Sequence, residues 1–269
     1  MKKKKKNKEK QRTDLSTSEK ELLEVNFCKD EVWETIRSCD GNKEPGPDGV
    51  NLKIVQSNWE VIQKGFMNFI WEFYNDSSIV KDLNNTFIAL IPKRAKPETM
   101  LDFRFISLVG SMYKLLVKVL AYWVKKVMSS IIGEFQMVFV KDHQILDSFV
   151  VTAKIIHGWK NDRGGGLLVK LDFEKAYDSV DHEFLDSMMV DMGFEERWRR
   201  WIHDCISSPA LSVLVNGSPT TQFGLERRLR QRDLLSLFFF SIVVERFSSL
   251  LRKVSDSDMI KGIIFGEND

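Results

Sequence analysis

The sequence predicts a mixed α/β protein that is rich in helices toward its N-terminal end. Stretches with apolar residues at three-to-four spacing dominate the first half of the chain, as amphipathic helices require. Alternating, β-rich segments occur at residues 84–93 and 211–223, and an apolar strand beginning at Leu167 ends on Asp172. With 269 residues, of which 43% are hydrophobic and 29% charged, the chain can bury a full core as one large domain or two lobes.

The N-terminal elements are indicated by local signals. Ser16 and Glu19 form a capping-box pattern before a first helix. "KDEVWETIRSC", residues 29–39, places Val32, Trp33 and Ile36 on one helical face. "EPGPDGV", residues 44–50, carries two prolines and two glycines, which favour a fixed turn.

The middle of the chain predicts alternating helices and a strand. One amphipathic helix is expected over residues 52–74, and its recurring apolar residues are Ile54, Trp59, Ile62, Phe66, Phe69, Ile70 and Phe73. "NNTFIALIPK", residues 84–93, predicts a strand that Pro92 ends. Residues 111–128 and 143–159 predict two further helices, and residues 135–142 an extended or looped segment.

After the strand that begins at Leu167, residues 182–193 and 195–208 predict two helices, the first closed by Gly193 at its C′ position. Residues 211–223 predict a hairpin that turns at Asn216-Gly217. "RRLRQRD", residues 227–233, predicts a basic loop before an apolar helix over residues 234–254. Its run "LLSLFFFSIVV" is interrupted by serine and is expected to be too short to span a bilayer, which needs about 20 apolar residues.

Charge is concentrated at the N-terminus. The first twelve residues hold eight Lys or Arg and one Glu, a net charge of +7, so the remaining 257 residues sum to −5 against a total of +2. Such a run is expected to be disordered. Three interpretations stay open: it contacts nucleic acid, it is a nuclear localisation signal, or it is a solvated tail without a partner. With no secretory signal pattern, we expect an intracellular protein, in the nucleus or the cytoplasm.

The cysteines and histidines do not indicate a zinc site. The three cysteines are Cys28, Cys39 and Cys205, an odd number without C-x-x-C spacing, which predicts reduced thiols. The four histidines are equally scattered. Chemistry points instead to Asp172, since a carboxylate at the end of a buried strand can hold Mg²⁺ together with substrate phosphates. Taken alone, Asp172 is explained better as a cap that ends the strand.

The motifs around Asp172 resolve this choice through a resemblance. "LVKLDFEKAYDSVD" resembles the first catalytic motif of reverse transcriptases of plant LINE-type non-LTR retrotransposons. Six further segments resemble family blocks in the family's order: "PGPDGV", "TFIALIPK", "DFRFISLVGSMYKLLVKVLA", "FVKDHQILDS", "WRRWIHDCISS" and "SVLVNGSP". The resemblance covers residues 26 to 266 and implies an RNA-directed DNA polymerase with right-hand fingers and a partial palm, without a thumb.

The resemblance implies a role for each matching residue. Asp172 would be the first carboxylate that binds two Mg²⁺ ions, and the carbonyl of Phe173 would complete the second ion's shell. Tyr177 would be the steric gate against a ribose 2′-hydroxyl, although an aromatic residue packed under the palm is the alternative. Asp178 is interpreted as structural. The implied partners are an RNA template, a DNA primer and deoxynucleotides, with no membrane and no specific protein partner.

Three more positions match nucleotide-contacting positions of the family. Arg104 and Lys93 match finger residues near the phosphates or the template, and Arg104 is preferred because a planar guanidinium grips phosphate at two points. Gln231 lies in "RRLRQRDLLSL", which corresponds to the family's second catalytic motif. It matches the polar residue of that motif, which contacts the nucleotide or the template. On the helix from residue 195, we interpret Trp198 and Trp201 as core residues. We interpret the arginines of this helix as solvated, and contact with the template is the alternative. These arginines are Arg197, Arg199 and Arg200.

The chain departs from the family pattern at eight positions. In the second motif, arginines replace two glycines and leucines replace two prolines, at Arg228, Arg232, Leu234 and Leu237. The other exchanges are Asp82 and Asp142 for glycine, Phe105 for proline and His143 for arginine. All eight can be written as C-to-T or G-to-A transitions, which suggests a silenced element decaying by cytosine deamination. Arginine in place of glycine is the most damaging exchange, because it cannot cheaply adopt positive φ or allow close backbone approach.

The domain boundaries expected from these motifs are a basic tail over 1–14, an N-terminal helical extension over 15–46, a fingers-like region over 47–166 and an incomplete palm over 167–269. The chain ends at "GIIFGEND", before the family's aspartate-pair motif, so the two Mg²⁺ ions would lack ligands and we expect no polymerisation by this chain alone. Two alternatives stay open, a non-catalytic nucleic-acid-binding remnant and a functionless transposon-derived open reading frame.

Overall fold

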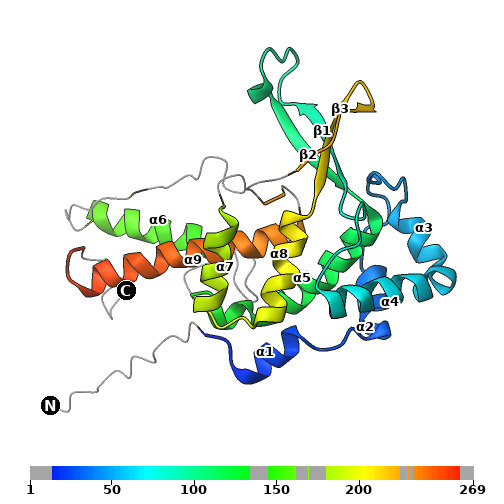
Figure 1. The fold of residues 1–269 in the computed structure, drawn as a ribbon. Coiled ribbons are helices and arrows are strands. Elements are labelled where there is room, and N and C mark those ends of the chain that lie inside the picture. Colours follow the sequence, from blue (N-terminus) through cyan, green and yellow to red (C-terminus); the bar gives the residue numbers. More distant parts are fainter. Residues whose placement is uncertain are drawn as a thin grey trace.

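The computed structural model describes residues 14–133, 145–161, 169, 180–224, 229–230 and 233–260. It confirms the predicted mixed α/β class. Helices form the body of the molecule, and a small sheet projects from it (Figure 1). The described helices are α1 (Thr17–Leu23), α2 (Lys29–Arg37), α3 (Leu52–Ser57), α4 (Trp59–Asp76), α5 (Ser111–Ile131), α6 (Ile145–Asn161), α7 (His182–Asp191), α8 (Glu196–Ser207) and α9 (Leu234–Asp256), with a short 3₁₀ turn η1 (Met100–Asp102).

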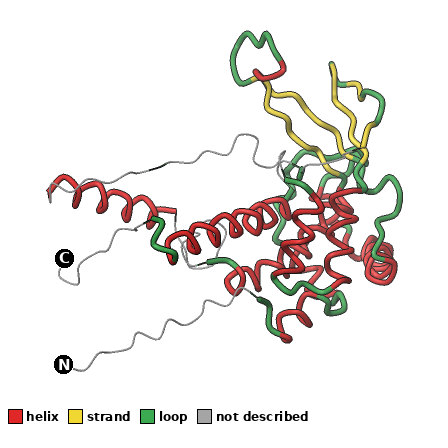
Figure 2. Tube along the Cα trace, turned by 60° about the vertical axis from the view of Figure 1, so that its left-hand side comes forward, coloured by secondary structure: helices red, strands yellow, loops and turns green. Residues whose placement is uncertain are grey.

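The sheet is mixed. Its strands are β1 (Thr86–Pro92), β2 (Phe103–Val109), β3 (Ala210–Val215), β4 (Ser218–Pro219) and β5 (Phe223–Gly224). They lie in the order β2-β1-β3-β4, with β5 paired to β3; β1 is antiparallel to β2 and parallel to β3. Figure 2 shows the strands reaching away from the helical body. Thr86, Val109 and Leu211 are buried at the inner end, whereas the far ends of β1 and β2 are more exposed, so only the root of the sheet belongs to the core.

Helix α5 is the centre of the core. It packs against α1, α2 and α9, and most of its length is buried. Its Trp123 is stacked on Phe27 with ring centroids 4.5 Å apart, and Phe27 in turn meets Trp201 of α8 at 6.0 Å. Segments from both ends of the described chain therefore share one apolar cluster.

The "PGPDGV" turn is locked onto the root of the sheet. The Asp48 carboxylate accepts hydrogen bonds from the backbone N–H and the hydroxyl of Ser111, the first residue of α5. Gly46 lies so close to Val109 that an added Cβ would stand 2.2 Å from its carbonyl carbon. The predicted fixed turn is thus also a tertiary anchor, because only glycine fits at position 46.

Several predicted local features are confirmed. The capping box of Ser16 and Glu19 starts α1, and Gly193 follows α7 with φ of +79°. The hairpin turns at Asn216 and Gly217, whose φ values are 50° and 81°. Both residues therefore adopt the left-handed conformation that a tight two-residue turn needs.

The single helix predicted over residues 52–74 is wrong in one respect, since it is two helices. Asn58 ends α3 and precedes α4, and its side-chain amide donates to the carbonyl of Ile54 at 2.9 Å. An asparagine that bonds a nearby carbonyl competes with the helical ladder, which explains the break. Ile54, predicted to lie on the apolar face, is consequently 53% exposed.

The apolar C-terminal helix is longer than its apolar run. Because α9 continues past that run to Asp256, it is, by length and composition, able to cross a bilayer, which corrects the expectation of too short a span. One such helix is a weak indication, since the core helix of a soluble protein passes the same test. Residues such as Phe239 and Ile242 of α9 are buried, and the helix packs against α5 and α7.

Candidate functional site

The ribbon formed by β1 and β2 carries Lys93 and Arg104, the two basic residues that the resemblance assigns to the fingers. Arg104 lies opposite Ile91 in the antiparallel register, and the Lys93 backbone N–H donates to the Asp102 carbonyl at 2.7 Å. Because side chains alternate along a strand, Lys93 and Arg104 occupy the same face as diagonal neighbours. The segment "DFRFISL", left unassigned from sequence, is therefore the strand that brings the two cations together.

The two cations differ in how they are engaged. The Lys93 ammonium donates to the carbonyl of Leu101 at 2.9 Å, across the loop that joins the two strands. Arg104 is exposed and has no hydrogen bond or ion pair with any residue in the described part of the chain. Its guanidinium donors are consequently available to a ligand.

Asp102 stabilises the loop beside these cations. Its carboxylate accepts from the backbone N–H groups of Glu98 and Thr99, both at 2.9 Å, and pairs with Arg94 at 2.6 Å. The backbone hydrogen bonds are the main cause that lowers the pKa of Asp102, with the Arg94 guanidinium contributing. The loop is thus fixed by a carboxylate that stays ionised, and Arg94 is engaged by protein.

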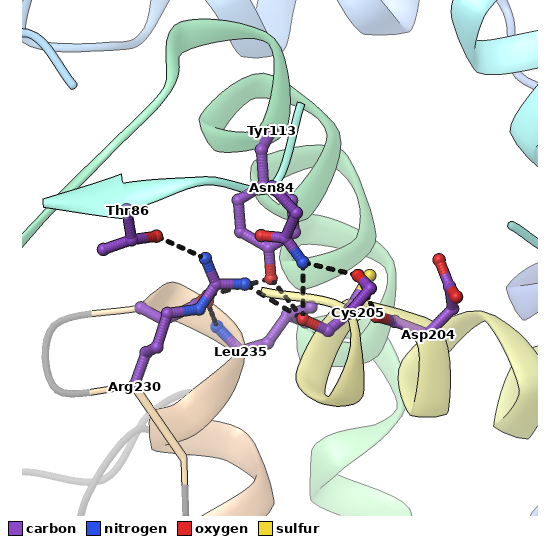
Figure 3. A network of polar contacts seen from close by, with 9 residues as sticks. Asn84, Thr86, Tyr113, Asp204, Cys205, Arg230 and Leu235 are labelled. Atoms are coloured by element: carbon purple, nitrogen blue, oxygen red, sulfur yellow. Dashed lines mark hydrogen bonds and ion pairs between the residues drawn. The ribbon is translucent and has the colours of Figure 1, made fainter. Parts of the chain in front are cut away.

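A buried polar network lies at the root of the ribbon (Figure 3). Its hub is the carbonyl of Cys205, in the last turn of α8, where a helix leaves carbonyls without intrahelical donors. This oxygen lies within 3.2 Å of the Asn84 amide, 3.1 Å of the Tyr113 hydroxyl and 2.9 Å of the Arg230 guanidinium. Segments from four parts of the chain therefore meet at one helix end.

Arg230 and Asp233 form the charged part of this network. Their side chains are 4% and 5% exposed, and the Arg230 Nε lies 3.8 Å from the Asp233 Oδ2. Arg230 also donates to the Thr86 hydroxyl at 3.0 Å and stacks over the Tyr113 ring, with its Cζ 4.1 Å from the centroid. The Asp233 carboxylate caps α9 through the Leu235 N–H at 3.0 Å.

Burial sets the protonation of the neutral members of the network. Removal from water raises the pKa of the Tyr113 phenol well above its usual value and raises that of the Cys205 thiol in the same direction. Both groups therefore stay neutral, which leaves Arg230 and Asp233 as the network's charges. The thiol of Cys205 is a buried structural group.

The described residues of the predicted basic loop over 227–233 lie outside helices and strands, as predicted, but they are buried. Leu229 and Arg230 are buried, because Arg230 reaches four different partners within the core. Sequence reasoning missed Arg230; the signal that could have found it is the apolar Leu229 before it and the helix-capping Asp233 three residues later. Neither is expected in a solvated loop.

Five of the discussed site residues are not tested. Asp172, Phe173, Tyr177, Asp178 and Gln231 lie outside the residues that the structure describes, so their roles stay predictions. Among the residues it does describe, no group of three His, Cys, Asp or Glu could hold a metal ion.

Helix α8 confirms the prediction for its tryptophans and, in part, for its arginines, because Arg197 and Arg200 are exposed while Arg199 is half-buried. Trp198 and Trp201 are fully buried. Arg199 binds both carboxylate oxygens of Asp186, at 3.0 and 2.9 Å, and Arg197 donates to the Tyr74 hydroxyl at 2.9 Å while stacking over its ring. These two arginines are engaged within the protein instead of being simply solvated, because α8 packs them beside partners on α7 and α4.

The described departures from the family pattern are accommodated locally. Asp82, in place of a glycine, adopts φ of 72°, a left-handed conformation that aspartate tolerates better than most residues. Phe105, in place of a proline, is paired within β2, and Leu234 is the first residue of α9. Leu237 is helical as well; Arg228, Arg232, Asp142 and His143 lie outside the described residues.

Comparison with known proteins places these features in a family. The family model described as "Reverse transcriptase (RNA-dependent DNA polymerase)" matches residues 91–264. The chain is 26% identical over 255 residues to the Transposon TX1 uncharacterized 149 kDa protein of Xenopus laevis, an alignment that covers 95% of this chain and 19% of that protein. It is 25% identical over 158 residues to the retrovirus-related Pol polyprotein from type-1 retrotransposable element R2 of Popillia japonica, which covers 58% and 22% of the two chains.

The chain therefore spans about a fifth of the length of these relatives. The matched region contains strand β2 with Arg104, the helices α5 to α9 and the network residues Arg230 and Asp233. The match covers more than half of the chain and agrees with the mixed α/β fold. This chain belongs to the reverse transcriptase (RNA-dependent DNA polymerase) family.

Proposed function

We propose that the chain is the fingers and part of the palm of an RNA-directed DNA polymerase from a plant LINE-type non-LTR retrotransposon, in a degenerate copy. The observation that carries this proposal is the family match over residues 91–264, which includes both strand β2 with Arg104 and the sequence around Gln231. The buried network supports it, because Thr86 at the start of β1 is bonded to Arg230, the residue directly before Gln231.

In this proposal, Arg104 binds the phosphates of the nucleotide or the template. Two features support that role, namely its exposure and its lack of a described protein partner on a ribbon whose neighbouring cation, Lys93, shares its face. A guanidinium with free donors can bind phosphate at two points. Lys93 contributes positive charge, although its ammonium also holds the Leu101 carbonyl.

The proposed metal ligands are Asp172 and the carbonyl of Phe173. When bound there, Mg²⁺ would offset the charge of the incoming triphosphate and polarise the primer 3′-hydroxyl. Tyr177 is proposed to exclude a ribose 2′-hydroxyl and Gln231 to touch the nucleotide or the template. The proposed partners are an RNA template, a DNA primer and deoxynucleotides, in the nucleus or cytoplasm.

We propose that the 269-residue chain alone does not extend a primer. Its sequence contains no two adjacent aspartates, the pair that the family resemblance calls for to complete the metal ligands. Primer extension on an RNA template with Mg²⁺ and deoxynucleotides tests this directly. Robust extension that Asp172→Ala abolishes would contradict the proposed inactivity while supporting the polymerase ancestry.

Binding tests the proposed partners independently of turnover. We expect the chain to bind a fluorescent RNA template–DNA primer with an affinity that falls as salt rises, since phosphate contacts release counterions. Arg104→Ala should weaken binding about tenfold, the effect of one lost charge-assisted contact. The matched control is Arg37→Ala, which removes an exposed arginine of α2 that is paired with Glu34.

The outcome also separates the alternatives. Salt-dependent binding without extension is what a nucleic-acid-binding remnant would show. No binding by the wild-type chain would favour a functionless open reading frame. Equal losses for Arg104→Ala and Arg37→Ala would contradict the role of the ribbon, because the effect would then follow net charge alone.

A further inference from the structure

The ribbon formed by β1 and β2 meets the helical body at its root. In the described part of the chain, its strands contact one another far more than they contact any helix. Figure 1 and Figure 2 show the ribbon projecting from the helices. Thr86 and Val109 are buried at the root, whereas Ile91 and Arg104 are exposed farther out. The direction of the ribbon is therefore set by the contacts that hold its root.

The chain that enters β1 is held by the C-terminal end of α8. The Ile79 backbone N–H donates to the Asp204 carboxylate at 2.6 Å. The side-chain amide of Asn84 donates to the Cys205 carbonyl at 3.2 Å and to the Ser208 hydroxyl at 2.8 Å. Figure 3 shows the Asn84 amide directed at that carbonyl. Two points of the segment before β1 are thus bonded to one helix end.

Arg230 bonds the same helix end to β1 itself. Its guanidinium donates to the Thr86 hydroxyl at 3.0 Å and to the Cys205 carbonyl at 2.9 Å. Arg230 and Thr86 are buried, and hydrogen bonds in such surroundings are stronger than in water. Because a guanidinium is planar, it also fixes the spacing between its two acceptors.

Strand β3 connects this helix end to the sheet a second time. Two residues separate α8 from β3, and β3 pairs in parallel with β1, with Leu211 opposite Thr86. On the other side of the ribbon, Gly46 packs closely against Val109 of β2. The contacts with α8 are therefore the anchor on the β1 side of the root.

Arg104 lies well beyond this anchor. It is opposite Ile91, five residues beyond Thr86, and a strand rises about 3.3 Å per residue, so Arg104 is roughly 17 Å from the root. A rotation of the ribbon by about 10° at its root would move Arg104 by about 3 Å. A charge-assisted hydrogen bond spans about 2.7–2.9 Å, so such a shift is enough to break a contact with a phosphate.

We propose that Asn84 and Arg230 are positioning residues, which fix the ribbon to the last turn of α8 and thereby set the place of the Arg104 guanidinium. Neither residue contacts the ligand. The inference rests on the proposed contact of Arg104 with phosphate and deepens it, since it names the residues that aim that contact.

Two variants weaken this anchor without removing a charge. Asn84→Ala deletes the amide donors, and the Asn84 Oδ1 has no hydrogen-bond partner in the part of the chain that the structure describes, so no described donor loses its acceptor. Thr86→Val replaces the hydroxyl that accepts from Arg230 by a methyl group. The matched control is Thr35→Val, the same exchange at a buried threonine of α2.

The first experiment measures the direction of the ribbon without a ligand. Spin labels on Met100→Cys, beside the end of the ribbon, and on Val61→Cys of α4 report the distance from ribbon to body, since both positions are exposed. A second pair on Val61→Cys and Tyr122→Cys spans two helices of the body. The background carries Cys28→Ser and Cys39→Ser, and the third native cysteine is buried.

The ribbon distance should respond while the body distance does not. We expect the ribbon distance to shift or broaden by about 3 Å in Asn84→Ala and in Thr86→Val, the displacement of a rotation of about 10°, and to stay unchanged in Thr35→Val. An unchanged ribbon distance in both variants would overturn the inference. Equal changes in the body pair would overturn it as well, because the contacts would then hold the whole fold.

The second experiment links the anchor to binding. Asn84→Ala should weaken primer–template affinity about fivefold in the wild-type background and less than about twofold in Arg104→Ala, because it acts through that guanidinium. Equal losses in the two backgrounds would overturn the link. A wild-type chain that binds no primer–template would overturn the proposed function, whereas the distance measurement would still decide whether Asn84 and Arg230 fix the ribbon.

Discussion

Two arginines of the matched region occupy opposite environments. Arg230 lies at the root of the ribbon, 4% exposed and in contact with β1, α5 and α8, whereas Arg104 lies on β2, exposed and without a described partner. The same guanidinium therefore has its donors engaged by protein in one place and available in the other. The comparison indicates that Arg230 contributes to folding, whereas the donors of Arg104 remain available for the ligand contact that we propose.

Removing the buried member of the pair should have the largest effect. Arg230→Ala leaves the Asp233 carboxylate buried without its cation, and losing one partner of a buried ion pair costs about 3–5 kcal/mol of folding free energy. Urea unfolding of wild type and variant measures the loss. If Arg230→Ala lowered the unfolding free energy no more than Arg37→Ala, which removes an exposed arginine, burial would not distinguish Arg230 from Arg104.

The backbone at the root should be nearly as sensitive. Gly46→Ala forces a Cβ to within 2.2 Å of the Val109 carbonyl carbon, and we expect a loss of about 3 kcal/mol, the upper part of the range for overpacking. The control is Gly65→Ala in α4, where an added Cβ meets nothing within 4 Å and helix propensity should give a gain of roughly 0.5–1 kcal/mol. Changes of the same sign at both glycines would show that close packing at the root is not the cause.

Asp82, in the turn that precedes β1, stands where the family pattern has glycine, so restoring the glycine tests whether this exchange costs stability. Asp82 has φ of 72°, where glycine is favoured, so Asp82→Gly should stabilise the fold by about 0.5–1 kcal/mol, less the hydrogen bond from Asn85. Asp82→Ala should destabilise it, since alanine has neither the glycine freedom nor the side-chain acceptor. Thermal unfolding of the three proteins orders them, and alanine at or above wild type would contradict the assigned strain.

The exposed arginine should have the smallest effect on stability. Arg104→Ala removes no described contact, so its unfolding free energy should stay within about 0.5 kcal/mol of wild type, as is typical of surface substitutions. The affinity loss expected for primer–template would then be a property of the ligand contact. A large stability loss would place Arg104 in the same class as Arg230.

Sequence alone predicted the features that depend on neighbouring residues. The capping box at Ser16, the Asn216-Gly217 turn and the end of α7 at Gly193 all follow from local backbone preferences, and the structure confirms them. The mixed α/β class followed from hydrophobic periodicity. These signals need no knowledge of what lies across the core.

Features set by tertiary contacts could not be predicted in the same way. Pairing with β1 makes residues 103–109 a strand, and the side-chain amide of Asn58 divides a helix that periodicity makes continuous. Arg230 is buried only because α5, α8 and β1 bring acceptors to it. Within the candidate site, the sequence predicted Arg104 and Lys93, whose shared face the register reveals, but it placed Arg230 in a basic loop without predicting its burial.

We propose that Asp172 holds a divalent ion together with nucleotide phosphates. Deoxynucleotide affinity measured with and without Mg²⁺, in wild type and in Asp172→Asn, tests it most directly. We predict that Mg²⁺ strengthens binding to the wild-type chain and leaves binding to Asp172→Asn unchanged. An equal gain in both proteins would contradict the claim, because the ion would then be acting on the nucleotide without that carboxylate.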